Sequence, residues 1–417
     1  MAKSENTKPF HKTEIPSDWE VTELGKIFDF KNGINAGKES YGKGVKFINV
    51  MEVIYSDYIT SEMIPGSVQI SDDQKELYQV KHGDVLFNRT SETIDEIGLT
   101  AVYYGNDDVV FGGFVIRGRP VDSSIDDKFK RYCFRSKMVR DQIIKSGQGA
   151  VRTNIGQGDL EKVEVPLPKL PEQKAIAHIL SLMDTAINKN NLMIAKKELQ
   201  KKWLIQNLLT GKKRVKGYAG EWKEIHIRDI AKEVSIKNKA DKQLTVLSCT
   251  KYDGLVPSLE YFGRKIFADD VSTYKVVPKN HFAYATNHIE EGSIGYQEIL
   301  DEALISPMYT VFKTDSTVND SFLYKLLKSH NLVFQYNARM EGSIDRRGGL
   351  RWDAFSIIKI HIPSIEEQTA IAQVLQAADK EIQLLKMKTE KLREKKKGLM
   401  QQLLTGKKRL KIEHNGK

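Results

Sequence analysis

Few cysteines and no long apolar run are the first notable features of this sequence. Cys133 and Cys249 lie in different halves of the 417 residues. Two isolated cysteines provide neither a disulfide framework nor the paired spacing of a zinc site, so we expect both to be buried as small apolar side chains. No apolar stretch approaches the roughly 18 residues of a membrane helix, and the N-terminal residues contain no hydrophobic segment. We therefore expect a cytoplasmic protein.

Sequence signatures of catalysis are also missing. The segment GINAGKES at 33–40 resembles a phosphate-binding loop. It has three residues between its glycines where that motif has four, and Glu39 stands where Ser or Thr would bind magnesium. Neither a G-x-S-x-G nor an H-E-x-x-H motif is present, and there is no Asn-Pro-Pro-Tyr-like segment of a nucleotide methyltransferase. We expect no catalytic residue, no metal ligand and no bound cofactor in this chain.

The charge balance is modestly positive. Lysine and arginine number 65 and aspartate and glutamate 55, which gives a net charge of +10. This balance permits nucleic-acid binding without requiring it. The apolar fraction of 40% and the length of 417 residues are those of a globular chain with two or three domains.

An internal duplication dominates the rest of the sequence. NLLTGKKR at 207–214 recurs as QLLTGKKR at 402–409, and the match extends backwards without a gap to Pro168 and Pro363. A period of about 200 residues is far longer than that of a solenoid repeat. Two unrelated helices of similar composition would not match over this length. The pattern therefore indicates duplication of a whole domain with its following helix.

Weaker matches extend the duplication through each half of the chain. Trp19 corresponds to Trp222 near the start of each domain, and Arg152 corresponds to Arg347 in a glycine-rich loop. The sequences between these landmarks differ. Each half therefore carries a different version of one domain on a shared frame.

Segments 168–214 and 363–409 have the pattern of long helices. Acidic residues begin each segment, and Gly211 or Gly406 follows its last apolar pair, as the helix dipole and C-terminal capping favour. Each helix should contain about 38 residues and be roughly 57 Å long.

Apolar residues inside both helices recur at spacings of four and three. Such a narrow stripe needs a partner helix, and the other copy is the obvious one. Because no long return connection precedes Trp222, we expect the pairing to be antiparallel. Asn190 and the pair Lys201 and Lys396 could set the register or lie at the rim. The residues expected to carry the pairing are Ile176, Leu180, Ile187, Ile371, Leu375 and Ile382.

The segments between the repeats indicate mixed α/β domains. Short β-rich runs bounded by turn signals include residues 45–55, 109–120 and 281–286. Residues 126–147 and 319–342 each predict an amphipathic helix, and a loop rich in glycine and arginine follows each of them.

Two polar loops recur in each half, at 87–98 and 149–158 in the first and at 285–295 and 342–352 in the second. Arginine, asparagine, glutamine, serine and threonine on such loops are the side chains that contact base edges and phosphates. Polar loops are also common on ordinary protein surfaces, so these loops alone do not establish DNA binding.

With the duplicated LPEQKAIAHIL…LLTGKKR and IEEQTAIAQVL…LLTGKKR segments and the PSDWE motif, the whole chain resembles the specificity (S) subunit of type I restriction–modification systems. The resemblance implies two target recognition domains, each reading one half of a gapped double-stranded DNA target. By analogy, the DNA-contacting residues would be Asn88, Arg89, Thr90, Arg152, Thr153 and Asn154 in the first domain, and Thr286, Asn287, Arg346, Arg347 and Arg351 in the second.

The resemblance also implies partners. Two modification (methyltransferase) subunits that use S-adenosylmethionine would dock on the helices, and restriction subunits would use ATP and Mg²⁺, while this chain would have no catalysis of its own. The alternative interpretation is a coiled-coil adaptor protein without DNA readout. An enzyme with a cryptic site in each domain is disfavoured, because the halves share no acid–base pair.

The predicted fold class is α/β, with two mixed α/β recognition domains in tandem and two long helices that pair as an antiparallel coiled coil with pseudo-twofold symmetry. The expected boundaries are an N-terminal tail at 1–14, domain 1 at 15–167, helix 1 at 168–214, domain 2 at 215–362, helix 2 at 363–409 and a C-terminal tail at 410–417.

Overall fold

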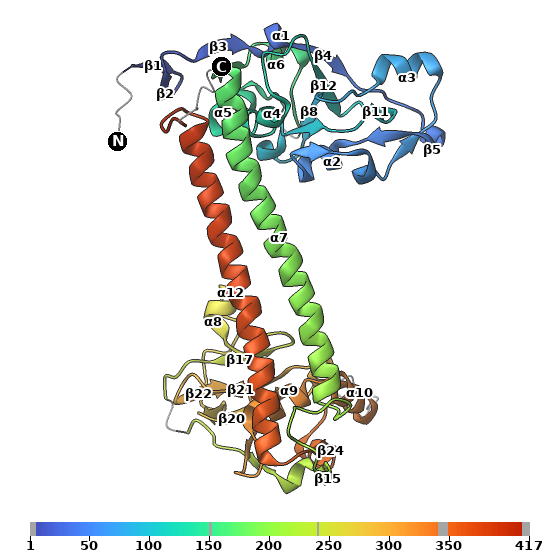
Figure 1. Cartoon of the computed structure of the whole chain (residues 1–417). Coiled ribbons are helices and arrows are strands. Elements are labelled where there is room, and N and C mark those ends of the chain that lie inside the picture. The colour runs from blue at the N-terminus through green and yellow to red at the C-terminus, as the bar shows by residue number, and fades with distance from the viewer. Residues whose placement is uncertain (1–5, 150–151, 240–241, 341–348, 411–417) are drawn as a thin grey trace. The chain divides into compact units, whose positions relative to one another are not determined.

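The computed structural model describes residues 6–149, 152–239, 242–340 and 349–410. The chain divides into two compact units (Figure 1). Unit 1 contains residues 1–191 and 388–417, and unit 2 contains residues 192–387. Two long helices, α7 (Leu170–Leu208) and α12 (Ile365–Leu403), contribute to both units, so each unit combines one mixed α/β domain with part of each helix. The predicted fold class is confirmed.

Unit 1 contains one domain built on a mainly antiparallel five-stranded sheet in the order β4-β12-β8-β10-β6, with a second sheet in the order β11-β5-β7. Its elements outside the long helices are β1 (Thr7–Phe10), β2 (Thr13–Pro16), β3 (Glu20–Glu23), α1 (Leu24–Ile27), β4 (Phe28–Asn32), η1 (Lys38–Ser40), β5 (Tyr41–Ile48), α2 (Val50–Tyr55), β6 (Tyr58–Ile59), η2 (Ser61–Met63), β7 (Ser67–Val68), α3 (Asp72–Tyr78), β8 (Val85–Asn88), β9 (Thr90–Ser91), η3 (Ile94–Glu96), β10 (Thr100–Tyr103), β11 (Val109–Phe111), β12 (Val115–Pro120), α4 (Asp127–Cys133), α5 (Lys137–Ser146), β13 (Thr153–Asn154), α6 (Gln157–Glu161) and β14 (Glu164–Leu167).

Unit 2 contains an antiparallel four-stranded sheet in the order β16-β23-β20-β21. Its elements outside the long helices are β15 (Lys223–His226), η4 (Ile227–Asp229), β16 (Ala231–Val234), β17 (Leu247–Thr250), β18 (Gly254–Pro257), α8 (Ser258–Phe262), β19 (Lys275–Pro278), β20 (His281–Ala285), η5 (Ile289–Glu291), β21 (Ile294–Gln297), β22 (Glu302–Ile305), β23 (Tyr309–Thr314), α9 (Asp320–Leu327), α10 (His330–Arg339), α11 (Trp352–Ser356) and β24 (Lys359–Ile362).

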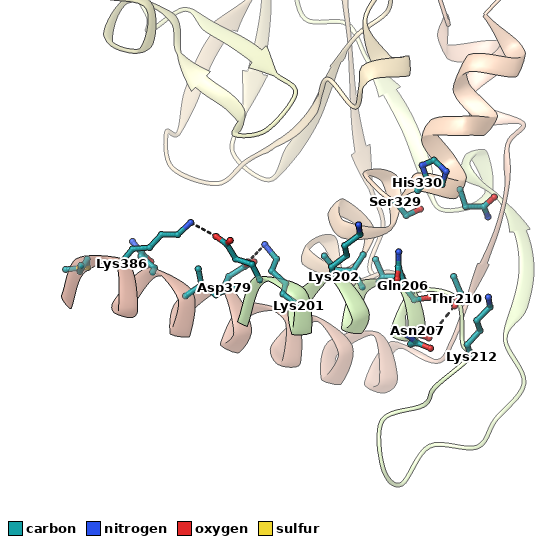
Figure 2. Close-up of a pocket in the computed structure, with 17 residues that line it drawn as sticks. Lys201, Lys202, Gln206, Asn207, Thr210, Lys212, Ser329, His330, Asp379 and Lys386 are labelled. Carbon is teal, nitrogen blue, oxygen red and sulfur yellow. Dashed lines mark hydrogen bonds and ion pairs between the residues drawn. The ribbon is translucent and has the colours of Figure 1, made fainter. Parts of the chain in front are cut away.

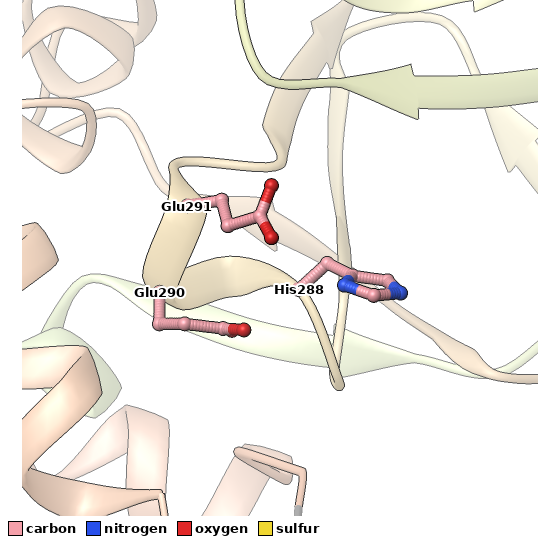
Figure 3. Close-up of side chains that lie close together, drawn as sticks. All are labelled: His288, Glu290 and Glu291. Atoms are coloured by element: carbon pink, nitrogen blue, oxygen red, sulfur yellow. The ribbon is translucent and has the colours of Figure 1, made fainter.

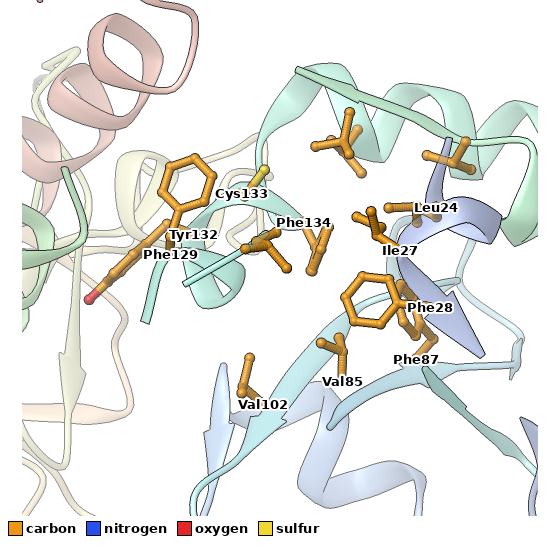
Figure 4. Close-up of a cluster of buried hydrophobic side chains, with 14 of the residues drawn as sticks. Leu24, Ile27, Phe28, Val85, Phe87, Val102, Phe129, Tyr132, Cys133 and Phe134 are labelled. Atoms are coloured by element: carbon orange, nitrogen blue, oxygen red, sulfur yellow. The ribbon is translucent and has the colours of Figure 1, made fainter. Parts of the chain in front are cut away.

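The central strands are buried because their sequences are apolar on both faces. All residues of β8 and β10 in unit 1 and of β20 in unit 2 are buried. Figure 4 shows part of the unit 1 core, where side chains of β4 and β8 meet those of α4. The same core includes Ile176 and Leu180 of α7 and Leu403 of α12, so the helices pack as part of the domain. In unit 2, Leu208 and Leu375 belong to the equivalent core.

The duplicated helix ends are joined by arginine–glutamate pairs. In unit 1, Arg409 donates to both carboxylate oxygens of Glu172, with Nε–Oε1 at 2.6 Å and Nη2–Oε2 at 2.7 Å, and it also donates to Asp18. In unit 2, Arg214 after α7 donates to Glu367 at the start of α12. Both glutamates are buried. In each unit, the segment that follows one long helix is therefore joined to the first turn of the other long helix.

A second pair of interhelical contacts also occurs at equivalent positions in the two units. Lys396 donates to Asp184 in unit 1, and Lys201 pairs with Asp379 in unit 2. Asp379 also accepts a hydrogen bond from Lys325 at 2.9 Å. Burial raises the pKa of the Asp379 carboxyl, but the hydrogen bonds from the two lysines outweigh it and lower the pKa. These equivalent contacts favour a register-setting role for Lys201 and Lys396, and they run between antiparallel helix segments.

Several local predictions differ from the structure. The segment 126–147, expected as one helix, forms α4 and α5, and 319–342 forms α9 and α10, because the backbone is extended at Ser136 and Ser329, which precede the second helix of each pair. Residues 50–55, expected to continue a strand, form α2, because Asn49 and Glu52 make a capping box there.

The N-terminal segment and the cysteines also depart from expectation in part. The segment before residue 15, expected as a tail, contains the β1–β2 hairpin, and Phe10 is buried in it. Cys133 is buried, but Cys249 is partly exposed. Within the described ranges, no helix combines the length and hydropathy needed to cross a membrane.

Candidate nucleic-acid interface

The two polar loops predicted in the first domain lie side by side in unit 1. Strand β13, which follows α5, pairs antiparallel with β9, which follows β8. Thr90 Oγ1 donates a hydrogen bond of 2.6 Å to Asn154 Oδ1. The structure therefore brings Thr90, Thr153 and Asn154 together on one surface. Thr90 and Thr153 are partly exposed and Asn154 is exposed.

Asn88 holds this loop in place from inside. Its side chain is buried, its Nδ2 donates to the Glu96 carbonyl at 2.9 Å, and its Oδ1 accepts from the Thr90 amide at 3.3 Å. Because both polar ends of the amide are used within the loop, the geometry assigns Asn88 to positioning the neighbouring residues.

The two arginines of this surface differ in how they are held. Arg89 is partly exposed, and its Nη1 donates to the Gly113 carbonyl at 3.2 Å. Arg152 is exposed and pairs with Glu92 through Nε at 3.1 Å and Nη2 at 2.9 Å. An ion pair between two exposed side chains contributes little free energy, so Arg152 could exchange Glu92 for a phosphate at small cost.

Unit 2 has a corresponding surface after strand β20. Thr286 Oγ1 donates to the Met308 carbonyl at 2.9 Å, and the Thr286 carbonyl accepts from the Leu350 amide at 2.8 Å. This second bond joins the loop of Asn287 to the segment that carries Arg351, and both side chains are exposed.

Arg346 and Arg347 were also predicted as contact residues of the second domain. They lie outside the described residues.

The helix-pairing residues predicted from the heptad spacing all lie inside the protein. In unit 1 they occupy α7, and in unit 2 they occupy α12. The buried set is Ile176, Leu180, Ile187, Ile371, Leu375 and Ile382.

An open groove of about 980 Å³ runs along the helix pair within unit 2. Its walls come from α7, α12 and the start of α10 (Figure 2). Lys201 in the groove is paired with Asp379, and Lys386 is paired with Glu198 at 2.7 Å. The lining offers charged side chains for a macromolecular surface, and both of its acidic residues, Glu198 and Asp379, are already paired with lysines.

Sequence reasoning missed one cluster, formed by His288, Glu290 and Glu291 in the η5 turn of unit 2 (Figure 3). The three residues fall within four positions of the chain, and this proximity was the available signal. No known metal motif has this spacing, so the sequence alone did not single it out.

Comparison with known proteins gives a family match for each half of the chain. Residues 16–196 and 219–394 each match the family described as the type I restriction modification DNA specificity domain. Over 437 aligned positions, the chain is 26% identical to the type I restriction enzyme MjaVIII specificity subunit of Methanocaldococcus jannaschii, and the alignment covers 98% of this chain and 97% of that protein.

Two crystal structures share the fold. The type I restriction–modification system S subunit from M. genitalium aligns with a TM-score of 0.54 and 16% identity, covering 95% of this chain and 98% of that one. The HsdS subunit from Thermoanaerobacter tengcongensis aligns with a TM-score of 0.56 and 14% identity, covering 95% and 99% of the two chains. With two matching domains along its length, this chain belongs to the type I restriction modification DNA specificity domain family.

Proposed function

We propose that this chain is the DNA sequence-specificity subunit of a type I restriction–modification complex, with each domain reading one half of a gapped, bipartite target. The observation that carries the proposal is the presence of two specificity domains in one chain. Their loops differ where a reader would touch DNA, since Asn88 and Arg89 in unit 1 are replaced by Thr286 and Asn287 in unit 2. Two different readers imply an asymmetric target.

The exposed side chains on these loops suit recognition of duplex DNA. Arginine can donate two hydrogen bonds to guanine, and asparagine can pair with the edge of adenine. Arg89 and Asn287 are therefore the residues that we assign to base contacts. Arg152 and Arg351 belong to the second polar loop of each domain, are exposed, and are assigned to phosphate contacts, which position the domain without reading sequence.

The long helices would set the spacing between half-sites and dock the modification subunits. Part of α7 in unit 2 presents an exposed apolar row formed by Leu192, Leu199 and Trp203, whose exposed fractions are 72%, 70% and 50%. Spacings of seven and four residues place these side chains on one face of the helix. An apolar row that the chain does not cover itself fits a subunit interface.

In this proposal the chain has no catalytic activity, and the chemistry resides in its partners. Methyltransferase subunits would bring S-adenosylmethionine, and restriction subunits would bring ATP and Mg²⁺. The chain itself would bind none of these cofactors, and double-stranded DNA would be its own ligand.

Modification mapping tests the proposal directly. Long-read sequencing would compare DNA from cells with and without this gene, in the presence of an active partner methyltransferase. We expect a gapped, asymmetric methylated motif that disappears with the gene. An unchanged methylation pattern would instead support the interpretation of the chain as a coiled-coil adaptor without DNA readout.

Single-domain variants sharpen this experiment. Asn287→Ala should change or weaken readout of one half-site only, and Arg89→Ala should affect only the other. Lys380→Ala, an exposed position on α12, is the matched control. Equal loss of both half-sites in either loop variant would contradict the assignment of one domain to each half.

A further inference from the structure

His288, Glu290 and Glu291 form a cluster of possible ligands in the η5 turn of unit 2. Its ligand atoms lie within 4.8 Å of one another, and Figure 3 shows the three side chains directed to the same side of the η5 turn. Oε2 of Glu290 is buried and has no hydrogen-bond partner. No described lysine, arginine or histidine forms an ion pair with either carboxylate. A buried carboxylate oxygen without a partner is costly, so this arrangement calls for a cation.

The equivalent turn of unit 1, η3, is held by side chains of the protein. Arg140 donates through Nη2 to the Asp95 carbonyl at 2.8 Å and through Nη1 to the Ile97 carbonyl. Ser91 Oγ donates to the Glu96 carboxylate at 2.7 Å. Here the acidic side chain has a donor and the backbone of the turn is fixed by a buried guanidinium.

In unit 2, a valine, Val333, stands at the position that corresponds to Arg140. Arg140 is the fourth residue after Ser136, which starts α5, and Val333 is the fourth residue after Ser329, which starts α10. Val333 also faces the turn, since its Cγ2 lies 3.9 Å from the position that a Cβ would take at Gly292. An apolar side chain therefore replaces the cation at the same place, while two carboxylates and an imidazole appear in the turn.

We propose that unit 2 binds a divalent transition-metal ion through His288, Glu290 and Glu291. The ion supplies the positive charge that Arg140 supplies in unit 1, and it fixes the turn between β20 and β21. The site stands on this geometry alone and does not depend on the proposed DNA readout.

One imidazole nitrogen and two carboxylate oxygens form a donor set that suits Zn²⁺. Donors at about 2.1 Å from a tetrahedral ion are about 3.4 Å apart, so modest side-chain rotations from the observed separations complete the shell. The fourth position remains open to water. Asn287 precedes the first ligand, so the ion would restrict the backbone beside a proposed base contact.

Zinc titration of the tag-free full-length chain tests the site. Calorimetry, together with equilibrium dialysis and metal quantification, should give one saturable Zn²⁺ ion per chain. His288→Ala and Glu290→Gln should each lower the affinity at least tenfold. Glu298→Gln, which alters an exposed acidic residue outside the cluster, is the matched control and should bind Zn²⁺ with the affinity of the wild-type chain.

Thermal unfolding separates binding from damage to the fold. Zn²⁺ should raise the melting temperature of the unchanged chain, because a ligand that binds only the folded state stabilises it. The metal-free Glu290→Gln chain should melt no lower than the metal-free wild-type chain, since the substitution replaces a carboxylate whose Oε2 has no hydrogen-bond partner. Zn²⁺ should not raise the melting temperature of this variant. Absence of stoichiometric binding, or equal affinity in His288→Ala and the unchanged chain, would overturn the proposal.

Discussion

Arg409 joins three segments that are distant in sequence, and its removal should be costly. Its guanidinium contacts Asp18 and both oxygens of buried Glu172. Arg409→Ala leaves the Glu172 carboxylate buried without its cation, and we expect a loss of about 2–4 kcal/mol in the free energy of unfolding of unit 1. Urea unfolding followed by hydrogen exchange within unit 1 measures this loss. Lys408→Ala, at an exposed neighbouring position, should leave stability unchanged, and an equal loss there would contradict the assignment.

The same contact predicts a dependence of stability on pH. The hydrogen bond from Arg409 lowers the pKa of the Asp18 carboxyl below its ordinary value of 3.8. A carboxyl with a lowered folded-state pKa stabilises the fold above its unfolded pKa, and this contribution is lost as pH falls through the folded pKa. The stability difference between the unchanged chain and Asp18→Asn should therefore be constant near neutral pH and shrink below pH 3.8. A difference that grows on acidification would contradict the hydrogen bond as its cause.

At the scale of the helix, leucines of the two long helices differ in burial according to whether they face the protein core. Leu375 on α12 is fully buried, and Leu192 on α7 is 72% exposed. Leu375→Ala should lower the free energy of unfolding by about 2–5 kcal/mol, because it removes buried methyl groups and leaves a cavity. Leu192→Ala should change it by less than about 0.5 kcal/mol. Chemical denaturation of both variants checks the contrast, and similar losses would show that the two leucines are not distinguished by burial.

Local sequence signals predicted some helices and strands accurately and missed others. The long helices were predicted with about 38 residues each and have 39, because acidic N-termini, terminal glycines and apolar periodicity are local signals repeated twice. Strands β11, β12 and β20 were also expected. The breaks at Ser136 and Ser329 were missed, since one amphipathic stripe continues across each break and neither serine makes a side-chain capping hydrogen bond that would mark it.

The candidate sites show the same limit. The pairing of β9 with β13, which brings Thr90 beside Asn154, joins segments whose relative placement no local pattern encodes. The burial of Asn88 depends on hydrogen bonds to Glu96 and Thr90. The orphan oxygen of Glu290 could be recognised only once the packing around the turn was known. Residue type identified the loops, and tertiary contacts decided which side chains remain free.

For the whole molecule, the two long helices should act as a ruler if the proposed function is right. Removing one helical turn from both α7 and α12 shortens each by about 5.4 Å, which corresponds to one or two base pairs at roughly 3.4 Å each. The deletions belong between the two interhelical contacts, within 185–200 on α7 and 380–395 on α12, so that the ion pairs of Asp184 with Lys396 and of Asp379 with Lys201 both survive. We expect the unread spacer to shorten while both half-site sequences persist in modification mapping. Because the reading loops lie in the domains, a change in the half-site sequences themselves would show that the helices do more than set distance.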